Sequence, residues 1–313
     1  MGRLQRFVER MASRPVVGVD LGSAVLKAVQ LERVADGGLV LRRCHVTPIL
    51  ADQPPAAACA RFLAQLDRSS VKCVFGLASP DLVVRPFQFP PMPKAELRRA
   101  IHLEAEQAIL NGHPASDVAI DWHLLASSKD QLHGLLAVVP KRVMAQALEP
   151  AKAAHLRPAV VDVQGLALWN AYWTLDAQQS GEPKTTLLIN LGSRSTNLVI
   201  ARGPQQLMLV RDEQIGLNGL GSGGGEADWI AEIRDSVGYA RSQGGLRALE
   251  LVVLTGGGAT DSTAALLQTS LGCSTIIWNP LRHVLRDAQS PAADDASGPL
   301  LAVAVGLALR RPT

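Results

Sequence analysis

The chain has 313 residues, enough for two domains that each bury a core of their own. Its net charge of +3 and its 4% of aromatic residues, without a lysine-rich run, exclude a dedicated nucleic-acid binder, so we expect no nucleic-acid partner. The four cysteines form no CxxC pair and have no histidine at zinc-ligand spacing, which favours buried thiols in a reducing compartment.

The N-terminal residues and the longest apolar run both favour a cytoplasmic protein. Arginines interrupt the apolar residues of segment 1–15, so it lacks the core of a signal peptide. The run at 299–309 is shorter than the about 20 residues of a membrane-spanning helix. Leu4, Phe7 and Met11 recur at helical spacing, which predicts a basic amphipathic segment. It is either a loose terminus or a contact with an anionic membrane surface or a membrane-anchored partner.

The first half opens with the pattern strand, tight turn, strand, turn and strand. Residues 16–21 are a buried apolar run that ends in a turn, 27–32 and 39–41 read as further strands, and 35–38 carry a turn signal. We therefore expect an antiparallel meander. The other expected elements are helices at 56–66, 94–109 and 143–154, apolar runs or strands at 73–77, 135–139 and 160–163, a proline breaker at 90–93, and a helix through Trp173.

The second half repeats this pattern after a polar stretch at 176–184, which we expect to be a linker. Strands at 185–190 and 196–201 flank a second Leu-Gly-Ser turn, and a further strand follows at 206–210. The recurrence is an internal repeat about 170 positions apart. The remaining expected elements are a glycine-rich loop at 221–225, a helix at 230–241, and a buried strand at 249–254 that runs into Thr255-Gly256-Gly257-Gly258-Ala259.

The two Gly-Ser turns carry groups suited to binding phosphate. Such a turn offers backbone N–H groups and a hydroxyl, and its glycine permits close approach. An acidic residue at the end of the preceding strand can hold a hydrated magnesium ion against the phosphate. Most single turns of this kind only join strands, but two in matching contexts favour a shared phosphate site. The first set is Asp20, Gly22, Ser23 and Lys27, and the second is Asn190, Gly192, Ser193 and Thr196.

A third glycine-rich element follows the buried strand of the second half. Gly256, Gly257 and Gly258 lack side chains, so a purine or ribose could lie against their backbone; the alternative is an ordinary strand-to-helix turn. No Gly-Lys-Ser or Gly-Lys-Thr follows, which excludes a P-loop. The catalytic residue stays unknown: Asp162 is one candidate, with capping of the following helix as its alternative role.

Together these motifs resemble the superfamily of actin, sugar kinases and DnaK-type chaperones, whose phosphate-1, phosphate-2 and adenosine motifs occur in this order. Within it, the chain resembles the PilM-like proteins of type IV pilus assembly, with matches from about residue 16 to 310. The matches are Gly18-Val19-Asp20-Leu21-Gly22-Ser23 with Val25-Leu26-Lys27-Ala28-Val29, Phe89-Pro90, Met92-Pro93, Glu96-Leu97, residues 101–106, Pro158, Val161-Asp162-Val163, the second turn, residues 254–259, Asn279-Pro280 and residues 306–310.

The resemblance implies an α/β, actin-like two-domain fold of duplicated ribonuclease H-like domains with an inserted small α+β subdomain. The expected bounds are 1–15 for the N-terminal segment, 16–175 for domain 1 with the insert near 75–158, and 185–313 for domain 2. ATP and magnesium are the implied cofactors. Asp20 would hold magnesium, the two turns would contact phosphates, and residues 256–258 would back the adenosine.

The resemblance also implies partners. PilM-like proteins bind the cytoplasmic tail of the inner-membrane protein PilN in a groove beside the insert. We therefore expect a PilN-like tail, other pilus assembly proteins, and a cytoplasmic location that is peripheral to the inner membrane through these partners. Closure of the two halves around ATP would alter the groove through different affinities for two states.

Two departures from the family pattern bear on catalysis. The second turn begins with Asn190 where the family has Asp, and an amide supplies no negative charge to magnesium and accepts no proton from water. Segment 216–229 is short, which predicts a reduced small subdomain in the second half. We expect nucleotide binding more than efficient hydrolysis. The alternatives are an MSHA-type or GspL-like secretion component, a small-molecule kinase or ATPase of the superfamily, and a pseudo-ATPase.

Overall fold

The computed structural model describes residues 16–34, 38–65, 72–108, 115–179, 181–221, 223–286 and 297–310. The expected amphipathic segment at 1–15 lies outside the described residues, as do Ala35, Asp36 and Gly37 of the expected turn and Ser180 of the expected linker. No described helix combines the length and the apolar character that crossing a membrane requires.

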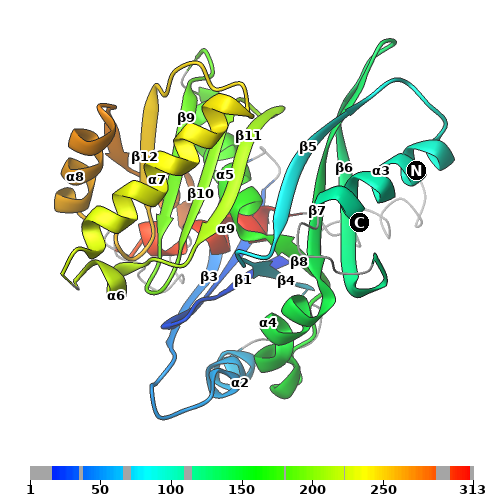
Figure 1. Cartoon of the computed structure of the whole chain (residues 1–313). Helices are drawn as coiled ribbons and strands as arrows, with labels where there is room; N and C mark the ends of the chain where they lie inside the picture. The colour runs from blue at the N-terminus through cyan, green and yellow to red at the C-terminus, as the bar shows by residue number, and fades with distance from the viewer. Residues whose placement is uncertain are drawn as a thin grey trace.

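Six strands form the first sheet, in the order β14-β3-β2-β1-β4-β8 (Figure 1). The first three in sequence form the expected antiparallel meander, and β4 and β8 add parallel strands next to β1. Apolar side chains point to both faces of β1, because both faces of this sheet are covered. The strands are β1 (Val16–Leu21), β2 (Val25–Arg33), β3 (Leu39–Pro48), β4 (Lys72–Leu77), β8 (Val160–Val163) and β14 (Leu285–Arg286).

The second sheet repeats this arrangement, in the order β11-β10-β9-β12-β13. Its first three strands are again an antiparallel meander, and β12 and β13 again add parallel strands beside the first. The repeat found in the sequence is therefore a repeat of strand order. The strands are β9 (Thr185–Leu191), β10 (Thr196–Arg202), β11 (Gln206–Glu213), β12 (Leu251–Thr255) and β13 (Thr275–Ile277).

A smaller antiparallel sheet, in the order β5-β7-β6, lies beside these two, with β5 next to β11 (Figure 1). Helix α3 (Lys94–Ala108) covers one face and buries Leu97, Ile101 and Ala105, the apolar stripe expected from helical spacing. This sheet lies within the range 75–158 expected for an insert. Its strands are β5 (Val83–Phe89), β6 (Val118–Ser127) and β7 (Leu132–Pro140).

The two large sheets enclose a central layer of two helices (Figure 1). Helix α5 (Gln164–Leu175) packs on both sheets, and α9 (Ala302–Leu309) packs on α5 and β1. Seven of the eight residues of α9 are buried, which explains its apolar sequence. The outer layers are α2 (Pro55–Gln65) and α4 (Lys141–Ala153) on the first sheet and α7 (Gly225–Ser242) and α8 (Asp261–Leu271) on the second.

Two glycines allow this central layer to pack closely. A Cβ atom at Gly18 of β1 would lie 2.1 Å from the Ala304 carbonyl oxygen of α9. A Cβ atom at Gly306 of α9 would lie 2.0 Å from the Ala167 carbonyl oxygen of α5. Any larger residue at either position would push these backbones apart. β1, α9 and α5 are therefore held in direct backbone contact.

The C-terminal part of the chain returns to the first sheet. β14 pairs with β3, and α9 packs on β1, although both lie in the range 185–313 expected for domain 2. Between β11 and α7, the described residues contain only the four-residue helix α6 (Leu217–Leu220). The short 3₁₀ helices are η1 (Ala115–Asp117), η2 (Ala177–Gln179), η3 (Pro280–His283) and η4 (Pro299–Leu301).

Candidate functional site

The β1–β2 turn and the β9–β10 turn both line one cavity of about 290 Å³, together with the glycines after β12. Nine of the eleven residues expected to bind a nucleotide line this cavity. They are Asp20, Gly22, Ser23, Lys27, Asn190, Gly192, Ser193, Gly256 and Gly257. The other lining residues are Ala24, Val25, Gln164, Ser195, Asn197, Leu217 and Leu300.

The two turns have the same internal hydrogen bond. The Gly22 N–H group donates to the Val25 carbonyl oxygen at 3.2 Å, and the Gly192 N–H group donates to the Ser195 carbonyl oxygen at 3.0 Å. A Cβ atom on either glycine would lie 3.0 Å from one of these acceptor oxygens. The repeat therefore extends from strand order to the backbone of the turns, and both glycines keep the turns compact.

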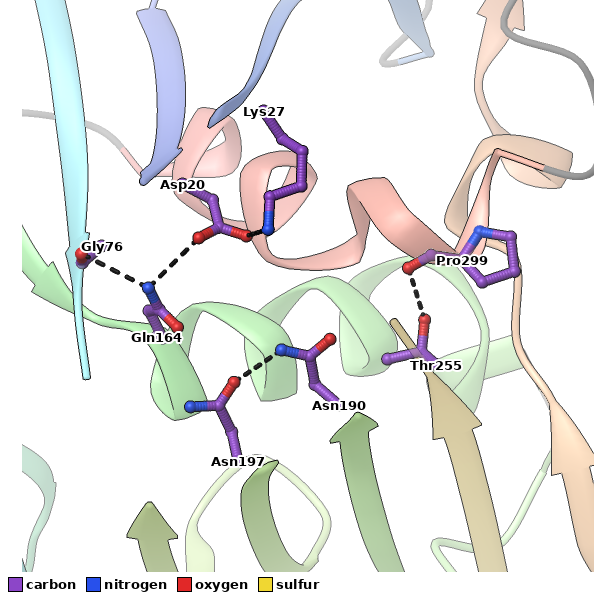
Figure 2. Close-up of polar contacts among 8 residues, drawn as sticks. All are labelled: Asp20, Lys27, Gly76, Gln164, Asn190, Asn197, Thr255 and Pro299. Carbon is purple, nitrogen blue, oxygen red and sulfur yellow. Dashed lines mark hydrogen bonds and ion pairs between the residues drawn. The ribbon is translucent and has the colours of Figure 1, made fainter. Parts of the chain in front are cut away.

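A buried ion pair closes the first turn (Figure 2). Asp20 and Lys27 are cross-strand neighbours on β1 and β2, and the Lys27 Nζ atom lies 2.6 Å from the Asp20 Oδ2 atom. Their side chains are only 4% and 12% exposed, so the charges interact in a poorly solvated setting. Gln164, the first residue of α5, donates from its Nε2 atom to the Asp20 Oδ1 atom at 3.2 Å. Both oxygens of Asp20 are thus engaged.

An amide pair takes the place of this ion pair at the second turn. Asn190 and Asn197 are cross-strand neighbours on β9 and β10, and the Asn190 Nδ2 atom donates to the Asn197 Oδ1 atom at 2.6 Å (Figure 2). The Asn197 Nδ2 atom in turn donates to the Asp212 Oδ1 atom on β11, also at 2.6 Å. The Asp212 Oδ2 atom accepts from the Ser79 backbone N–H group at 2.8 Å. We call Asn190, Asn197 and Asp212 the amide relay.

Burial is the main cause that raises the pKa of Asp212, to about 6. The hydrogen bonds from Asn197 and from the Ser79 N–H group act in the opposite direction, since they stabilise the carboxylate, and the nearby Glu213 carboxylate raises the pKa further. Asp212 therefore carries a full negative charge only at neutral and higher pH. Ser79 lies between β4 and β5, so this carboxylate joins the second sheet to the segment that precedes the small sheet.

The glycine turn after β12 is fixed by the segment that precedes α9. Gly256 has a positive φ of 92°, a conformation that suits glycine, and its N–H group donates to the Pro299 carbonyl oxygen at 3.0 Å. The Thr255 hydroxyl donates to the same oxygen at 2.9 Å (Figure 2). A Cβ atom at Gly256 would lie 2.5 Å from the Asn190 Oδ1 atom, so only glycine allows this turn to reach the second turn.

Three residues singled out in the sequence lie away from the cavity. Thr196 is fully buried, and its hydroxyl donates to the Ile215 carbonyl oxygen and accepts from the Trp229 indole N–H group. Gly258 packs against the Leu191 side chain. The expectation that Asp162 caps α5 is wrong. The cap position is Val163, and no side chain caps that helix.

Asp162 instead lies near the C-terminal end of the described chain. Its Oδ2 atom is 3.4 Å from an Arg310 guanidinium nitrogen, and its Oδ1 atom accepts from the Val163 N–H group. Burial raises the pKa of Asp162, while Arg310 and the Val163 hydrogen bond lower it and Asp121 raises it. It does not line the cavity and is placed to stabilise local structure.

Seven lining residues were not among the eleven candidates, and two of them hydrogen-bond through their side chains to a candidate: Asn197 to Asn190, and Gln164 to Asp20. Asn197 follows Asn190 by the same seven positions that separate Lys27 from Asp20, so this spacing could have identified it in place of Thr196. Gln164 carries no motif of its own. Its only sequence signal is its place directly after the buried strand β8, where α5 begins.

The arrangement is suited to binding an anion and offers little for acid–base chemistry. Among the described residues that line the cavity, Asp20 and Lys27 alone carry acidic or basic side chains, and they neutralise each other. The described residues contain no group of three or more His, Cys, Asp or Glu side chains that could hold a metal ion by themselves.

Residues 18–221, more than half of the chain, match the family model described as type IV pilus assembly protein PilM. The chain belongs to this family. Comparison with curated proteins gives no match. The PilM family assignment agrees with the resemblance seen in the sequence, and it places the two turns and Gln164 inside the matched region.

Solved structures confirm the α/β, actin-like fold expected for this PilM-family chain. A structure of the PilM–PilN type IV pilus biogenesis complex aligns with a TM-score of 0.77 and 24% identity, over 95% of this chain and 98% of that one. The cytoplasmic domain of EpsL, an inner-membrane component of the Vibrio cholerae type II secretion system, aligns with a TM-score of 0.50 and 13% identity, over 94% of each chain. A Bacteroides thetaiotaomicron protein with an actin-like ATPase fold and unknown function aligns with a TM-score of 0.51 and 10% identity, over 87% of this chain and 93% of that one.

The raised pKa of Asp212 predicts a specific pH dependence of stability. The folded state keeps this proton up to about pH 6, whereas the unfolded chain releases it near pH 4. The contribution of Asp212 to the free energy of unfolding is therefore fully present below pH 4 and is lost as pH rises through 6, by about 3 kcal/mol. The Asp212→Asn variant lacks this titration, so its stability should gain about 3 kcal/mol relative to wild type between pH 4 and pH 7.

Urea denaturation across this pH range measures the difference. The exposed Asp52→Asn variant removes one carboxylate elsewhere and should follow the wild-type profile. Parallel profiles for Asp212→Asn and wild type would contradict the prediction.

Proposed function

We propose that this chain is an ATP-binding, actin-like scaffold of type IV pilus assembly. It acts on the cytoplasmic side of the inner membrane, binds Mg-ATP in the cavity between its two halves, and holds the cytoplasmic tail of a PilN-like inner-membrane protein. The observation that carries the nucleotide proposal is the pair of turns with matching hydrogen bonds that line one cavity.

The residues of the cavity fit the phosphate end of a nucleotide. Serine hydroxyls and the backbone of both turns line it, and the N-terminal end of α5, where a helix dipole is positive, lies at Gln164. Among the described residues that line the cavity, Lys27 supplies the one basic group. With phosphate bound, its ammonium group can leave the Asp20 carboxylate, which frees that carboxylate to hold a hydrated magnesium ion. Gly256 and Gly257 offer a bare backbone to the adenosine.

Binding is better supported than hydrolysis. An attacking water would need a base. Among the described residues that line the cavity, Asp20 has the only carboxylate, and it is paired with Lys27 and Gln164 or, with nucleotide bound, would hold the hydrated magnesium ion. Asn190 is an amide held by Asn197, and Asp162 lies elsewhere. These contacts give no support to the alternative of a small-molecule kinase. Magnesium, when bound, supplies positive charge against the phosphates.

The family assignment and the PilM–PilN structure support the partner proposal. In this chain, β6 is an edge strand of the small sheet and β8 is an edge strand of the first sheet. Edge strands have unpaired backbone groups that can capture an extended peptide. The likeness to the EpsL domain concerns the fold, so a type II secretion role remains the second candidate.

Neutralising the cavity ion pair should weaken nucleotide binding. In the double variant Asp20→Asn/Lys27→Met neither charge is left unpaired, so the fold is kept while the phosphate partner is lost. We expect wild type to bind Mg-ATP in calorimetry and the variant to bind at least 30-fold more weakly, a loss of about 2 kcal/mol. The matched control is Glu32→Gln/Arg42→Met, which removes an exposed ion pair of the same 2.6 Å separation from the same sheet. Wild-type binding that is absent at millimolar Mg-ATP would contradict the nucleotide proposal.

The partner proposal has a separate test. A fluorescent peptide with the sequence of a PilN-like cytoplasmic tail should bind wild type in an anisotropy titration without added nucleotide. Asp20→Asn/Lys27→Met should bind it within threefold of wild type, because the edge strands do not contribute to the cavity. The partner proposal alone would be contradicted if, at a 100-fold molar excess of protein, the tail peptide binds no better than a scrambled peptide.

A further inference from the structure

The amide relay contains one group that determines the orientation of all the others. An ionised carboxylate can only accept hydrogen bonds, whereas an asparagine side chain has a donor end and an acceptor end. The Asp212 Oδ2 atom accepts from the Ser79 backbone N–H group, which can only donate. Asp212 is 7% exposed, so water does not replace these partners.

The orientation passes along the relay one amide at a time. Because the Asp212 Oδ1 atom is an acceptor, Asn197 must turn its Nδ2 atom toward it, and the two lie 2.6 Å apart. The Asn197 Oδ1 atom then faces Asn190, which must donate from its own Nδ2 atom, again at 2.6 Å. Asn197 is 3% exposed, so neither amide can turn over without leaving a buried group unpaired.

The relay leaves Asn190 with its oxygen free on the cavity side. In Figure 2 the Asn190 Nδ2 atom points to Asn197 and its Oδ1 atom points away from it. That oxygen lies beside Gly256, where an added Cβ atom would come within 2.5 Å of it. Both residues line the cavity. Asn190 thus offers the cavity an acceptor and not a donor, which suits the water shell of a divalent cation and repels a phosphate oxygen.

We propose that Asp212 is a positioning residue that acts through Asn197 to make Asn190 present its carbonyl oxygen to the hydrated divalent cation of a bound nucleotide. This inference rests on the proposed function for its ligand, but the orientation of the relay itself does not. A carboxylate at the position of Asn190 would supply the same acceptor. The chain reaches that result with a neutral side chain, and the negative charge sits two residues further along the relay, on Asp212.

A stability cycle tests the relay without any nucleotide. In Asn190→Asp, the new carboxylate faces the Asn197 oxygen, or Asn197 turns over and its oxygen faces Asp212, so one contact is repulsive either way. In Asp212→Asn, every amide of the relay can turn over, and an acceptor at position 190 is then satisfied by the Asn197 Nδ2 atom. Asn190→Asp should raise the unfolding equilibrium constant by some factor in wild type. In the Asp212→Asn background that factor should be at least tenfold smaller.

The cycle is measured by urea unfolding at pH 8. The control background is Glu213→Gln, which removes the neighbouring carboxylate on β11, a group that pairs with Arg211 and Ser236 outside the relay. In the Glu213→Gln background, the factor by which Asn190→Asp raises the unfolding equilibrium constant should stay within threefold of its value in wild type. An equal factor in wild type, Asp212→Asn and Glu213→Gln would overturn the proposal. If Asn190→Asp alone fails to fold, a folded Asp212→Asn/Asn190→Asp protein supports it, and an unfolded one overturns it.

A binding measurement tests the role of the relay toward the cation. Calorimetry measures the affinity for ATP once in magnesium and once in EDTA. The ratio of the two affinities is the advantage that the metal confers. That advantage should fall at least tenfold in Asp212→Asn and stay within threefold in Glu213→Gln, while ATP in EDTA binds Asp212→Asn at least as well as wild type. An unchanged advantage in Asp212→Asn would overturn the proposal. If wild type binds no ATP at all, the proposed function fails, and the stability cycle still decides the orientation of the relay.

Discussion

The close packing of α9 against β1 and α5 is the constraint on which the site depends. Gly18 and Gly306 leave no room for a Cβ atom, so the backbones of β1, α9 and α5 are in direct contact. Both large sheets pack on this central layer, which sets where their first strands end. The turns after β1 and β9 consequently meet at one cavity, and α5 brings Gln164 to the same place. The site is thus assembled by helix packing and not by any single loop.

Within this frame, a duplicated backbone carries different chemistry in its two halves. The turns share their hydrogen bond, and the cross-strand pairs share their register, yet one pair is Asp20 with Lys27 and the other is Asn190 with Asn197. The first pair offers the cavity a charge of each sign, and the second offers a neutral oxygen. Such an asymmetric site is suited to a charged, metal-bearing ligand that contacts the two turns differently.

The sequence identified the elements that depend on local patterns. The two meanders, the apolar stripe of α3 and the glycine turns follow from strand alternation, helical spacing and turn residues, so nine of the eleven candidates line the cavity. The second turn's set includes Thr196, but an alternating strand turns that side chain into the core toward Trp229. Asp212 and Gln164 could not be identified, because their roles arise from contacts between distant segments, such as Asp212 with Ser79. The return of β14 and α9 to the first sheet is likewise a tertiary result.

A crystal structure with magnesium and a non-hydrolysable ATP analogue would show whether the two turns bind one nucleotide. We predict phosphate density between the turns at Gly22 and Gly192, with the Lys27 ammonium moved from its 2.6 Å contact with Asp20 onto a phosphate oxygen. We also predict that the cation's water shell lies against the Asn190 oxygen. A ligand bound elsewhere, with the Asp20–Lys27 ion pair unchanged, would contradict the claim that the two turns form one nucleotide site.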